Sequence, residues 1–383
     1  MSTLAREIGE ARAAILPELH RKSFLTTQSA SPAELEALVA LAELFAKLDR
    51  RGLKSSLFEA ELAYALFFDN STRTKSAWAG ATARLGMRPV IVDGGSTQVA
   101  HGETARETGV MLGMNAHALG VRHDLILGEG NRFMVEMRAG LDAYLEATGD
   151  RRAVPMVNLQ CDVDHPTQAL ADLAWMTECF PEGLRGKKVA VSWAYSPSYA
   201  KPLSVPQGLI SLLTRFGAHV VLAHPAGYDL MPEVVSWAEG NARGAGGSFS
   251  QVTSMDDAFA GAHIVYPKSW GPYELMLARV DANRAGDKAA MAEIERQALA
   301  RNAEHRDWIC DGRRMALTAS GNALYMHCLP ADIGAEVSAE VMRKYEVSLA
   351  RQANKKVYVI MALLAAAKTA GLEARLDAVL QGE

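Results

Sequence analysis

Three short polar motifs carry residue types that could bind an anion and polarise a carbonyl group. The first is Ser71-Thr72-Arg73-Thr74, which stands between a short apolar run and a segment with helical spacing. Backbone N–H groups at the start of a helix point outward, and the helix dipole favours an anion there. The hydroxyls add donors, and the Arg73 guanidinium matches phosphate oxygens. The motif indicates a phosphate site, although ordinary helix caps use the same residues.

The second motif is His165-Pro166-Thr167-Gln168. Proline favours the first turn of a helix, so a helix is expected to start just past His165. A histidine titrates near neutral pH and can donate a hydrogen bond to a carbonyl oxygen, while the Gln168 amide can recognise an NH2 group. A capping histidine and a surface glutamine would leave the same pattern.

The third motif is His327-Cys328-Leu329-Pro330, which follows an apolar run. Neighbouring side chains on a strand point to opposite faces, so His327 and Cys328 are not expected to act as a pair. No base is fixed beside Cys328 by sequence, which disfavours a cysteine nucleophile. The four cysteines lie far apart without zinc-type spacing, so we expect reduced thiols and no metal site.

Strand and helix signals alternate around these motifs, which is typical of right-handed βαβ units and parallel sheets. The sequence therefore predicts an α/β fold of two doubly wound parallel-sheet domains, with a C-terminal helix that packs back on the first. Strands are expected at residues 63–68, 89–92, 188–193, 219–223, 264–266 and 323–327, helices at 75–85, 205–216, 232–240 and 354–370, and a surface loop at 241–250.

Length and charge narrow the classes of function. A chain of 383 residues suggests two domains, joined near residues 170–185. The formal net charge of -4 gives no sign of a nucleic-acid or membrane partner. We read neither a signal peptide nor a membrane span, and we expect a cytoplasmic protein. A Rossmann oxidoreductase is disfavoured because no Gly-x-Gly-x-x-Gly follows a strand.

In their order along the chain, the three motifs resemble the aspartate/ornithine transcarbamylase family, and the similarity to its YgeW-type members covers nearly the whole sequence. The resemblance implies a carbamoyl-phosphate-binding domain from residues 1–170, completed by 350–383, and a second-substrate domain from 171–349. It also implies a homotrimer with active sites between subunits. No metal or organic cofactor is needed for this chemistry. The loop at 193–206 resembles that of N-acyl-ornithine transcarbamylases, which implies a knotted second domain.

The resemblance assigns one set of residues to carbamoyl phosphate. Thr74, Arg122 and His165 would be catalytic, because they would stabilise negative charge on the carbonyl oxygen as an oxyanion hole does. Lys356 stands where relatives have an arginine, so it keeps the charge but loses the bidentate fork. Gln98 would reach into a neighbouring subunit's site. The full expected set is Ser71, Thr72, Arg73, Thr74, Gln98, Arg122, His165, Gln168, Leu329 and Lys356.

The second-substrate site departs from the ornithine pattern Asp-x-x-x-Ser-Met-Gly. Valine replaces the acid at Val265, so the α-amino group of ornithine would lose its partner. Lys268 suggests a carboxylate on the substrate instead, although a solvent-exposed lysine is the alternative. The expected second-substrate residues are Tyr195, Lys268, Ser269, Trp270 and Cys328.

These features predict a transcarbamylase that uses carbamoyl phosphate and a small amine substrate. A candidate for that amine is 2,3-diaminopropionate. The alternatives are an N-acyl-ornithine or ornithine carbamoyltransferase, or a regulator that binds carbamoyl phosphate without turnover. The presence of His165, Arg122 and Gln168 disfavours the regulator.

Overall fold

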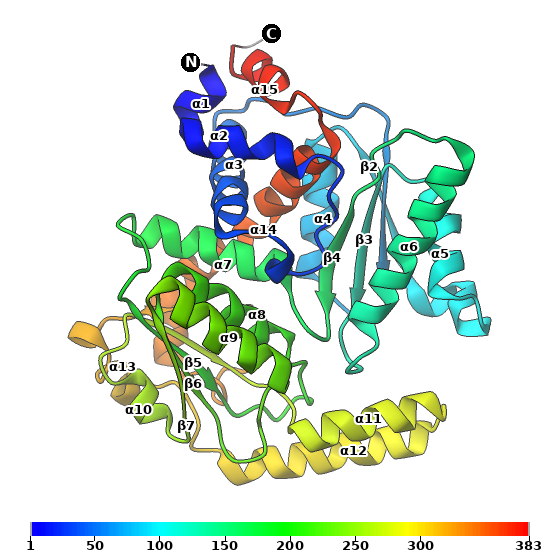
Figure 1. Cartoon of the computed structure of the whole chain (residues 1–383). Helices are drawn as coiled ribbons and strands as arrows, with labels where there is room; N and C mark the ends of the chain where they lie inside the picture. Colours follow the sequence, from blue (N-terminus) through cyan, green and yellow to red (C-terminus); the bar gives the residue numbers. More distant parts are fainter. Residues whose placement is uncertain (1, 382–383) are drawn as a thin grey trace.

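Two parallel β-sheets organise residues 2–381, the part of the chain that the computed structural model describes (Figure 1). The strand order is β2-β1-β3-β4 in the first sheet and β7-β6-β5-β8-β9 in the second, and every pairing is parallel. The predicted α/β fold with two parallel sheets is thus confirmed. The strands are β1 (Leu62–Phe67), β2 (Arg88–Asp93), β3 (Ala118–His123), β4 (Met156–Cys161), β5 (Lys188–Trp193), β6 (His219–Ala223), β7 (Ser248–Val252), β8 (Ile264–Lys268) and β9 (Leu324–Tyr325).

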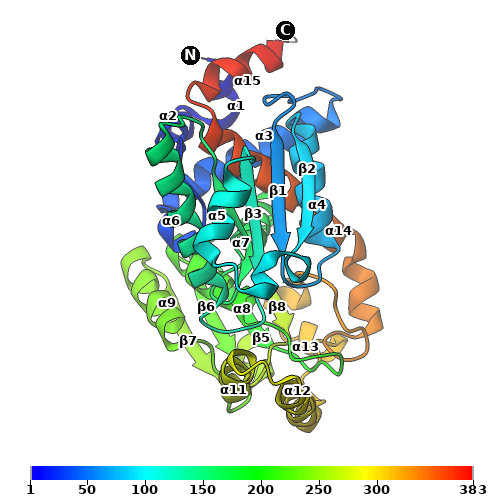
Figure 2. The ribbon, with the colours of Figure 1, turned by 90° about the vertical axis from the view of Figure 1, so that its right-hand side faces the viewer.

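Helices cover both faces of the first sheet. Figures 1 and 2 show α5 and α6 on one face, and α3, α4 and α14 on the other. No helix within residues 2–381 is long and apolar enough to cross a lipid bilayer. The helices are α1 (Thr3–Ile8), α2 (Glu10–Ile15), α3 (Pro32–Arg50), α4 (Arg73–Arg84), α5 (Ala105–Gly113), α6 (Gly130–Thr148), α7 (Pro166–Cys179), α8 (Ser204–Leu213), α9 (Pro232–Ala245), α10 (Met255–Phe259), α11 (Tyr273–Arg284), α12 (Lys288–Asn302), α13 (Gly312–Met315), α14 (Ala339–Lys368) and α15 (Leu372–Gln381).

Each sheet has one point where the strand order reverses. In the first sheet the reversal lies between β1 and β3, and in the second it lies between β5 and β8. Loops that leave the carboxyl ends of two such strands diverge, and the crevice between them is where open α/β sheets bind ligands. The Ser71–Thr74 motif follows β1, and the proline-rich loop at 194–203 follows β5. Both reversals therefore coincide with the segments that the sequence marked for chemistry.

Two helices link the halves of the chain. Helix α7 begins at Pro166, as the second motif predicted. Helix α14 packs against α7 and also against α3 and α4. It begins at Ala339, after the cap of Ser338, well before the predicted start at 354. The early half was missed because its outward residues are charged and exposed, which hides the apolar stripe. The domain bounds and the knot stay predictions.

The predicted loop at 241–250 was wrong. Helix α9 continues to Ala245, and strand β7 follows at Ser248–Val252. Gly246 ends the helix in the left-handed conformation, with φ of +71°. Strand β7 lies at the edge of its sheet and carries exposed serine and glutamine side chains. Such a strand lacks the apolar pattern by which buried strands are found.

Candidate active site

A cavity of about 240 Å³ lies where the carboxyl ends of strands from both sheets meet. Its residues come from the loop after β1, the ends of β3, β4 and β8, the loops after β5 and β9, and helices α4, α7, α8 and α14. It is lined by Asn70, Ser71, Thr72, Arg73, Thr74, Arg122, Gln160, His165, Gln168, Tyr199, Lys201, Pro202, Val205, Lys268, Cys328, Leu329, Pro330 and Lys356.

The start of α4 forms one wall. Arg73 is the first helical residue, and the Ser71 Oγ accepts a hydrogen bond from the Thr74 N–H at 3.2 Å. The side chain of Thr74 is buried against the cavity. Burial lowers the pKa of Arg73, and the nearby charge of Arg122 acts in the same direction. An anion at this helix start would relieve both effects.

Arg122 forms the adjoining wall at the end of β3. A shift in pairing register between Val121 and Arg122 turns this residue relative to β4. Its Nη2 donates to Asp124 Oδ2 at 3.0 Å. Its Nε is buried and meets no acceptor among residues 2–381. A buried guanidinium N–H without an acceptor is costly, so an oxygen of a bound molecule fits beside it.

His165 and Lys356 close the cavity floor. His165 occupies the N-cap position of α7, and its Nε2 lies 3.4 Å from Lys356 Nζ on α14. Burial, followed by the charges of Lys356, Arg122 and Arg73, holds the pKa of His165 well below its usual range. The imidazole is therefore neutral at physiological pH. A neutral ring N–H can still polarise a carbonyl group by donating a hydrogen bond.

Most sequence-predicted site residues meet in this one cavity. Seven of them come from the first 170 residues of the chain, and four come from the rest. They are Ser71, Thr72, Arg73, Thr74, Arg122, His165 and Gln168, and Lys268, Cys328, Leu329 and Lys356.

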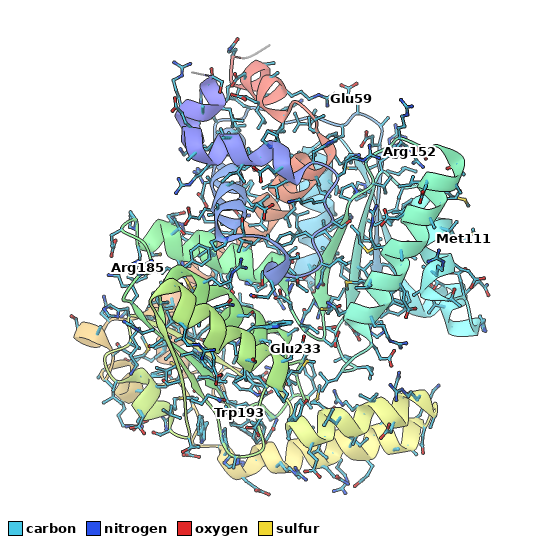
Figure 3. All side chains as sticks on the ribbon, in the orientation of Figure 1. Glu59, Met111, Arg152, Arg185, Trp193 and Glu233 are labelled. Atoms are coloured by element: carbon cyan, nitrogen blue, oxygen red, sulfur yellow. The ribbon has the colours of Figure 1, made fainter. Side chains whose placement is uncertain are left out.

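Four predicted site residues do not line the cavity. Trp270 is fully buried in the core, where its Nε1 donates to the Tyr228 carbonyl and its own carbonyl accepts from Trp193 Nε1, each at 2.8–2.9 Å (Figure 3 marks Trp193 inside the second half). Ser269 turns its backbone N–H to Glu336 at 2.8 Å. The remaining two are Tyr195, which faces Arg306, and Gln98, which is exposed.

Several cavity residues were not predicted. Tyr199, Lys201 and Pro202 belong to the proline-rich loop, from which the sequence singled out only Tyr195. The loop composition was the available signal, but composition does not tell which side chains turn inward. Gln160 is the next-to-last residue of β4, a strand that the sequence did not predict, and its Nε2 donates to Ser204 Oγ at 3.0 Å. Asn70, Val205 and Pro330 complete the unpredicted lining.

Lys268 is the last residue of β8 and is buried in the cavity wall. Its Nζ donates to the Ser269 carbonyl at 2.7 Å. The solvent-exposed alternative is therefore wrong. Burial lowers the pKa of Lys268, and the neighbouring charge of Lys201 adds to that effect. Lys201 itself donates to Asp332 and Glu336, at 2.8 Å each.

The cavity wall is cationic. Within the described chain, none of its lining residues is an aspartate or a glutamate. The carboxylates of Asp332 and Glu336 lie behind the wall, where both form ion pairs with Lys201. Residues 2–381 also contain no group of three or more His, Cys, Asp or Glu side chains that could hold a metal ion. The cavity thus suits a molecule with anionic groups at both ends.

Cys328 lines the cavity, but His327 turns away from it. Strand β9 ends at Tyr325, so both residues lie in the loop beyond it. The His327 Nδ1 accepts from the Leu329 N–H at 2.8 Å, and its Nε2 lies 3.6 Å from Glu336 Oε2. Leu329 has a positive φ of 53°, a strained conformation for a leucine that this contact helps to hold. His327 therefore shapes the loop and does not activate the thiol.

Comparison with known proteins agrees with this geometry. Residues 22–178 match the carbamoyl-P binding domain, and residues 203–367 the Asp/Orn binding domain, of aspartate/ornithine carbamoyltransferase. The chain is 48% identical over 372 residues to "Putative carbamoyltransferase YgeW" of Escherichia coli (strain K12), which covers 95% of this chain and 94% of that protein. It is 30% identical over 368 residues to N-acetylornithine carbamoyltransferase of Xanthomonas axonopodis pv. citri (strain 306), with 92% and 98% covered.

Solved structures give the same answer. A variant of N-acetyl-L-ornithine transcarbamylase, complexed with carbamyl phosphate and N-succinyl-L-norvaline, matches with a TM-score of 0.74 and 27% identity, covering 91% of this chain and 99% of that one. The same values hold for acetylornithine transcarbamylase complexed with acetylcitrulline. Both domains of the family match this chain, in the family's order and over most of the sequence. The chain belongs to the aspartate/ornithine carbamoyltransferase family, and its enzyme class is carbamoyltransferase.

Proposed function

We propose that this enzyme transfers a carbamoyl group between carbamoyl phosphate and the amino group of a small amino acid. The observation that carries the proposal is the cavity in which Arg73, Arg122 and Lys356 face Lys268 across the meeting point of the two sheets. In the forward direction a neutral amine attacks the carbonyl carbon and a C–N bond forms. The bond from carbon to the phosphate oxygen breaks, phosphate leaves with the electron pair, and the amine loses a proton.

The first-half wall suits the carbamoyl phosphate end of this reaction. The start of α4, with Ser71, Thr72 and Arg73, would hold the phosphate. Thr74, Arg122 and His165 would surround the carbonyl oxygen, where negative charge builds in the transition state. The unpaired Nε of Arg122 and the neutral ring of His165 support this assignment. Holding both substrates in line supplies much of the remaining rate.

The second-half wall suits an amine that also carries a carboxylate. Lys268 would pair with that carboxylate, because Asp332 and Glu336 are already occupied by Lys201. The cavity volume of about 240 Å³ lies below the roughly 300–1,000 Å³ of pockets for drug-sized ligands, so both substrates must be small. The candidate is 2,3-diaminopropionate, which is short and has a carboxylate.

An N-acyl-ornithine is the second candidate, and one observation favours it. The lining has no carboxylate for a free α-ammonium group, and acylation removes that charge. The relatives named N-acetylornithine carbamoyltransferase share 28–30% identity with this chain. Plain ornithine fits least well, because Val265 is buried and apolar at the position of the usual acid.

We also propose that the enzyme is a homotrimer whose sites are completed across subunits. Gln98 supports this arrangement, because it is exposed on the short 3-10 helix η4 (Gln98–His101) and does not line the cavity of its own chain. A residue that the family pattern assigns to the site, yet that faces solvent in one chain, fits a neighbour's cavity.

A screen of amines tests the proposal. The enzyme is incubated with carbamoyl phosphate and one amine at a time, and both phosphate release and the carbamoylated product are measured. An enzyme-free series corrects for spontaneous breakdown of carbamoyl phosphate. We expect a small amino acid to give product in step with phosphate. Binding of carbamoyl phosphate without amine-dependent product for any small amino acid would instead identify a catalytically silent binder.

A further inference from the structure

A fully buried carboxylate lies behind the cavity and has no part in the chemistry described above. Asp172 stands one helical turn past Gln168 on α7 and has no exposed surface. Its Oδ1 accepts hydrogen bonds from Gln168 Nε2 at 2.7 Å and from Gln352 Nε2 at 2.6 Å. Its Oδ2 accepts from the Tyr266 hydroxyl at 3.0 Å. Helices α7 and α14 and strand β8 thus meet at this side chain.

This contact fixes how the Gln168 amide is turned. A glutamine amide has one oxygen that only accepts and one NH2 that only donates. Two oxygens in contact would repel, so the NH2 must face Asp172. The planar amide then directs Oε1 to the other side, where Gln168 lines the cavity. The cavity therefore offers a hydrogen-bond acceptor at this point, and a charged partner holds it there.

The carboxylate remains charged and cannot easily release Gln168. Burial raises the pKa of Asp172 to about 6, against the opposing hydrogen bonds from Gln352, Gln168 and Tyr266. Above neutral pH the group is therefore ionised and accepts from all three donors. Gln352 is locked as well, since its Oε1 accepts from the His327 N–H at 3.3 Å. Rotation of the Gln168 amide would replace a charge-assisted bond by a repulsive contact.

We propose that Asp172 is a positioning residue for donor selectivity, because it holds the Gln168 carbonyl oxygen toward the NH2 group of the transferred carbamoyl unit. The inference rests on the proposed function and deepens it. An acyl phosphate with a methyl group in place of NH2 leaves this acceptor without a donor. A site built to accept a hydrogen bond discriminates strongly against an analogue that lacks one. Acetyl phosphate is that analogue, since it keeps the phosphate and the carbonyl group.

The test compares the affinities of carbamoyl phosphate and acetyl phosphate, without any second substrate. Asp172→Leu keeps a side chain of similar size but removes both acceptor oxygens, so no partner holds the Gln168 NH2 group and the amide is free to turn. We expect the preference for carbamoyl phosphate over acetyl phosphate to fall by roughly 10-fold or more. The ratio of the two affinities is the readout, because loss of the Asp172 charge near Lys356 would weaken carbamoyl phosphate, acetyl phosphate and inorganic phosphate alike. A loss of packing alone would weaken all three ligands together.

Tyr266→Phe is the matched control. It removes a donor from the same carboxylate without touching Gln168, so it should keep the wild-type preference. An Asp172→Leu protein that folds, binds phosphate and retains the preference would overturn the proposal. If that variant does not fold, neutron diffraction from deuterium-exchanged wild-type crystals decides. We expect deuterons on the Gln168 side-chain atom that faces Asp172. Deuterons on the atom that faces the cavity would refute the proposal. Wild-type protein that binds no carbamoyl phosphate would count against the proposed function instead.

Discussion

Lys356 and His165 form a buried pair with 3.4 Å between Lys356 Nζ and His165 Nε2. Burial lowers the pKa of Lys356 to about 7, and the charges of Arg122 and Arg73 add to this effect, while Cys328 and Asp172 oppose it. An arginine at this place would stay charged at every pH. We therefore expect Lys356 to gain its charge when a phosphate group binds beside it.

The enzyme should therefore take up protons when carbamoyl phosphate binds. At pH 8 most Lys356 side chains are neutral in the free enzyme, and phosphate oxygens would stabilise the ammonium form. We expect up to about one proton per site, measured by calorimetric titration in two buffers of different ionisation enthalpy. Lys356→Arg is the matched control, because it keeps a cation that cannot titrate. Equal uptake by that variant would assign the proton to another group.

The same lysine should make stability depend on pH. Its pKa is about 7 in the folded enzyme and near 10.4 in an unfolded chain, so between these values the unfolded state binds more protons. The contribution of Lys356 to stability therefore rises with pH across this window and is constant below it. We expect Lys356→Met to melt at a higher temperature than the wild type at pH 7. That advantage should shrink at pH 9. An advantage that is absent at pH 7, or unchanged at pH 9, would contradict the pKa.

Arg73 is predicted to carry most of the phosphate affinity. Arg73→Ala should weaken carbamoyl phosphate binding by roughly 100-fold, since two charge-assisted hydrogen bonds are lost. The fold should survive, because Arg73 lies at the rim of the cavity and its loss leaves the core intact. Calorimetry measures the affinity, and circular dichroism checks the fold. Lys75→Ala is the control, because Lys75 is a cation on the same helix that lies over Phe67 and outside the cavity. Unchanged affinity in Arg73→Ala would move the phosphate site elsewhere.

Gln98 is predicted to act in a neighbouring subunit. Gln98→Ala and His165→Ala should each be inactive alone, and a mixture with reshuffled subunits should recover activity. In mixed trimers, some sites would combine an intact His165 with an intact Gln98 from the next chain. Mixing His165→Ala with Gln168→Ala is the control, because both residues line the cavity of one chain and no intact site can form. Proven mixed trimers without recovery would count against a shared site.

The sequence predicted the parts of the cavity lining that depend on local structure. Arg73 could be found because a helix start after a strand is visible within ten residues. Lys201 could not, since its partners Asp332 and Glu336 lie more than 130 positions away. Asp172 is similar, because Gln352 is 180 positions distant and only the fold brings them together.

Some errors have a local cause. Trp270 and Ser269 follow Lys268 in one motif, yet only Lys268 faces the cavity. The motif does not show how the chain turns after β8. That turn buries the Trp270 indole, whose Nε1 donates to the Tyr228 carbonyl. Strand β7 was missed because an exposed edge strand has no apolar signature. Burial alone is not sufficient, since strand β4 is buried throughout and was also missed because Asn158 and Gln160 interrupt its apolar run.

Lys268 and Val265 should together decide the second substrate. We expect ornithine to have a kcat/KM roughly 100-fold below that of the best amine, because an unpaired buried ammonium costs several kcal/mol. Turnover is compared for ornithine, N-acetylornithine and 2,3-diaminopropionate, and then repeated with Lys268→Met, which should raise KM for the preferred carboxylate. Lys188→Met is the control, since this lysine starts β5 and its Nζ donates to carbonyls outside the cavity. If ornithine is the best of the three, the interpretation of Val265 is wrong. If Lys268→Met leaves both ranking and KM unchanged, Lys268 has no part in binding, and the carboxylate must pair with another cation of the wall.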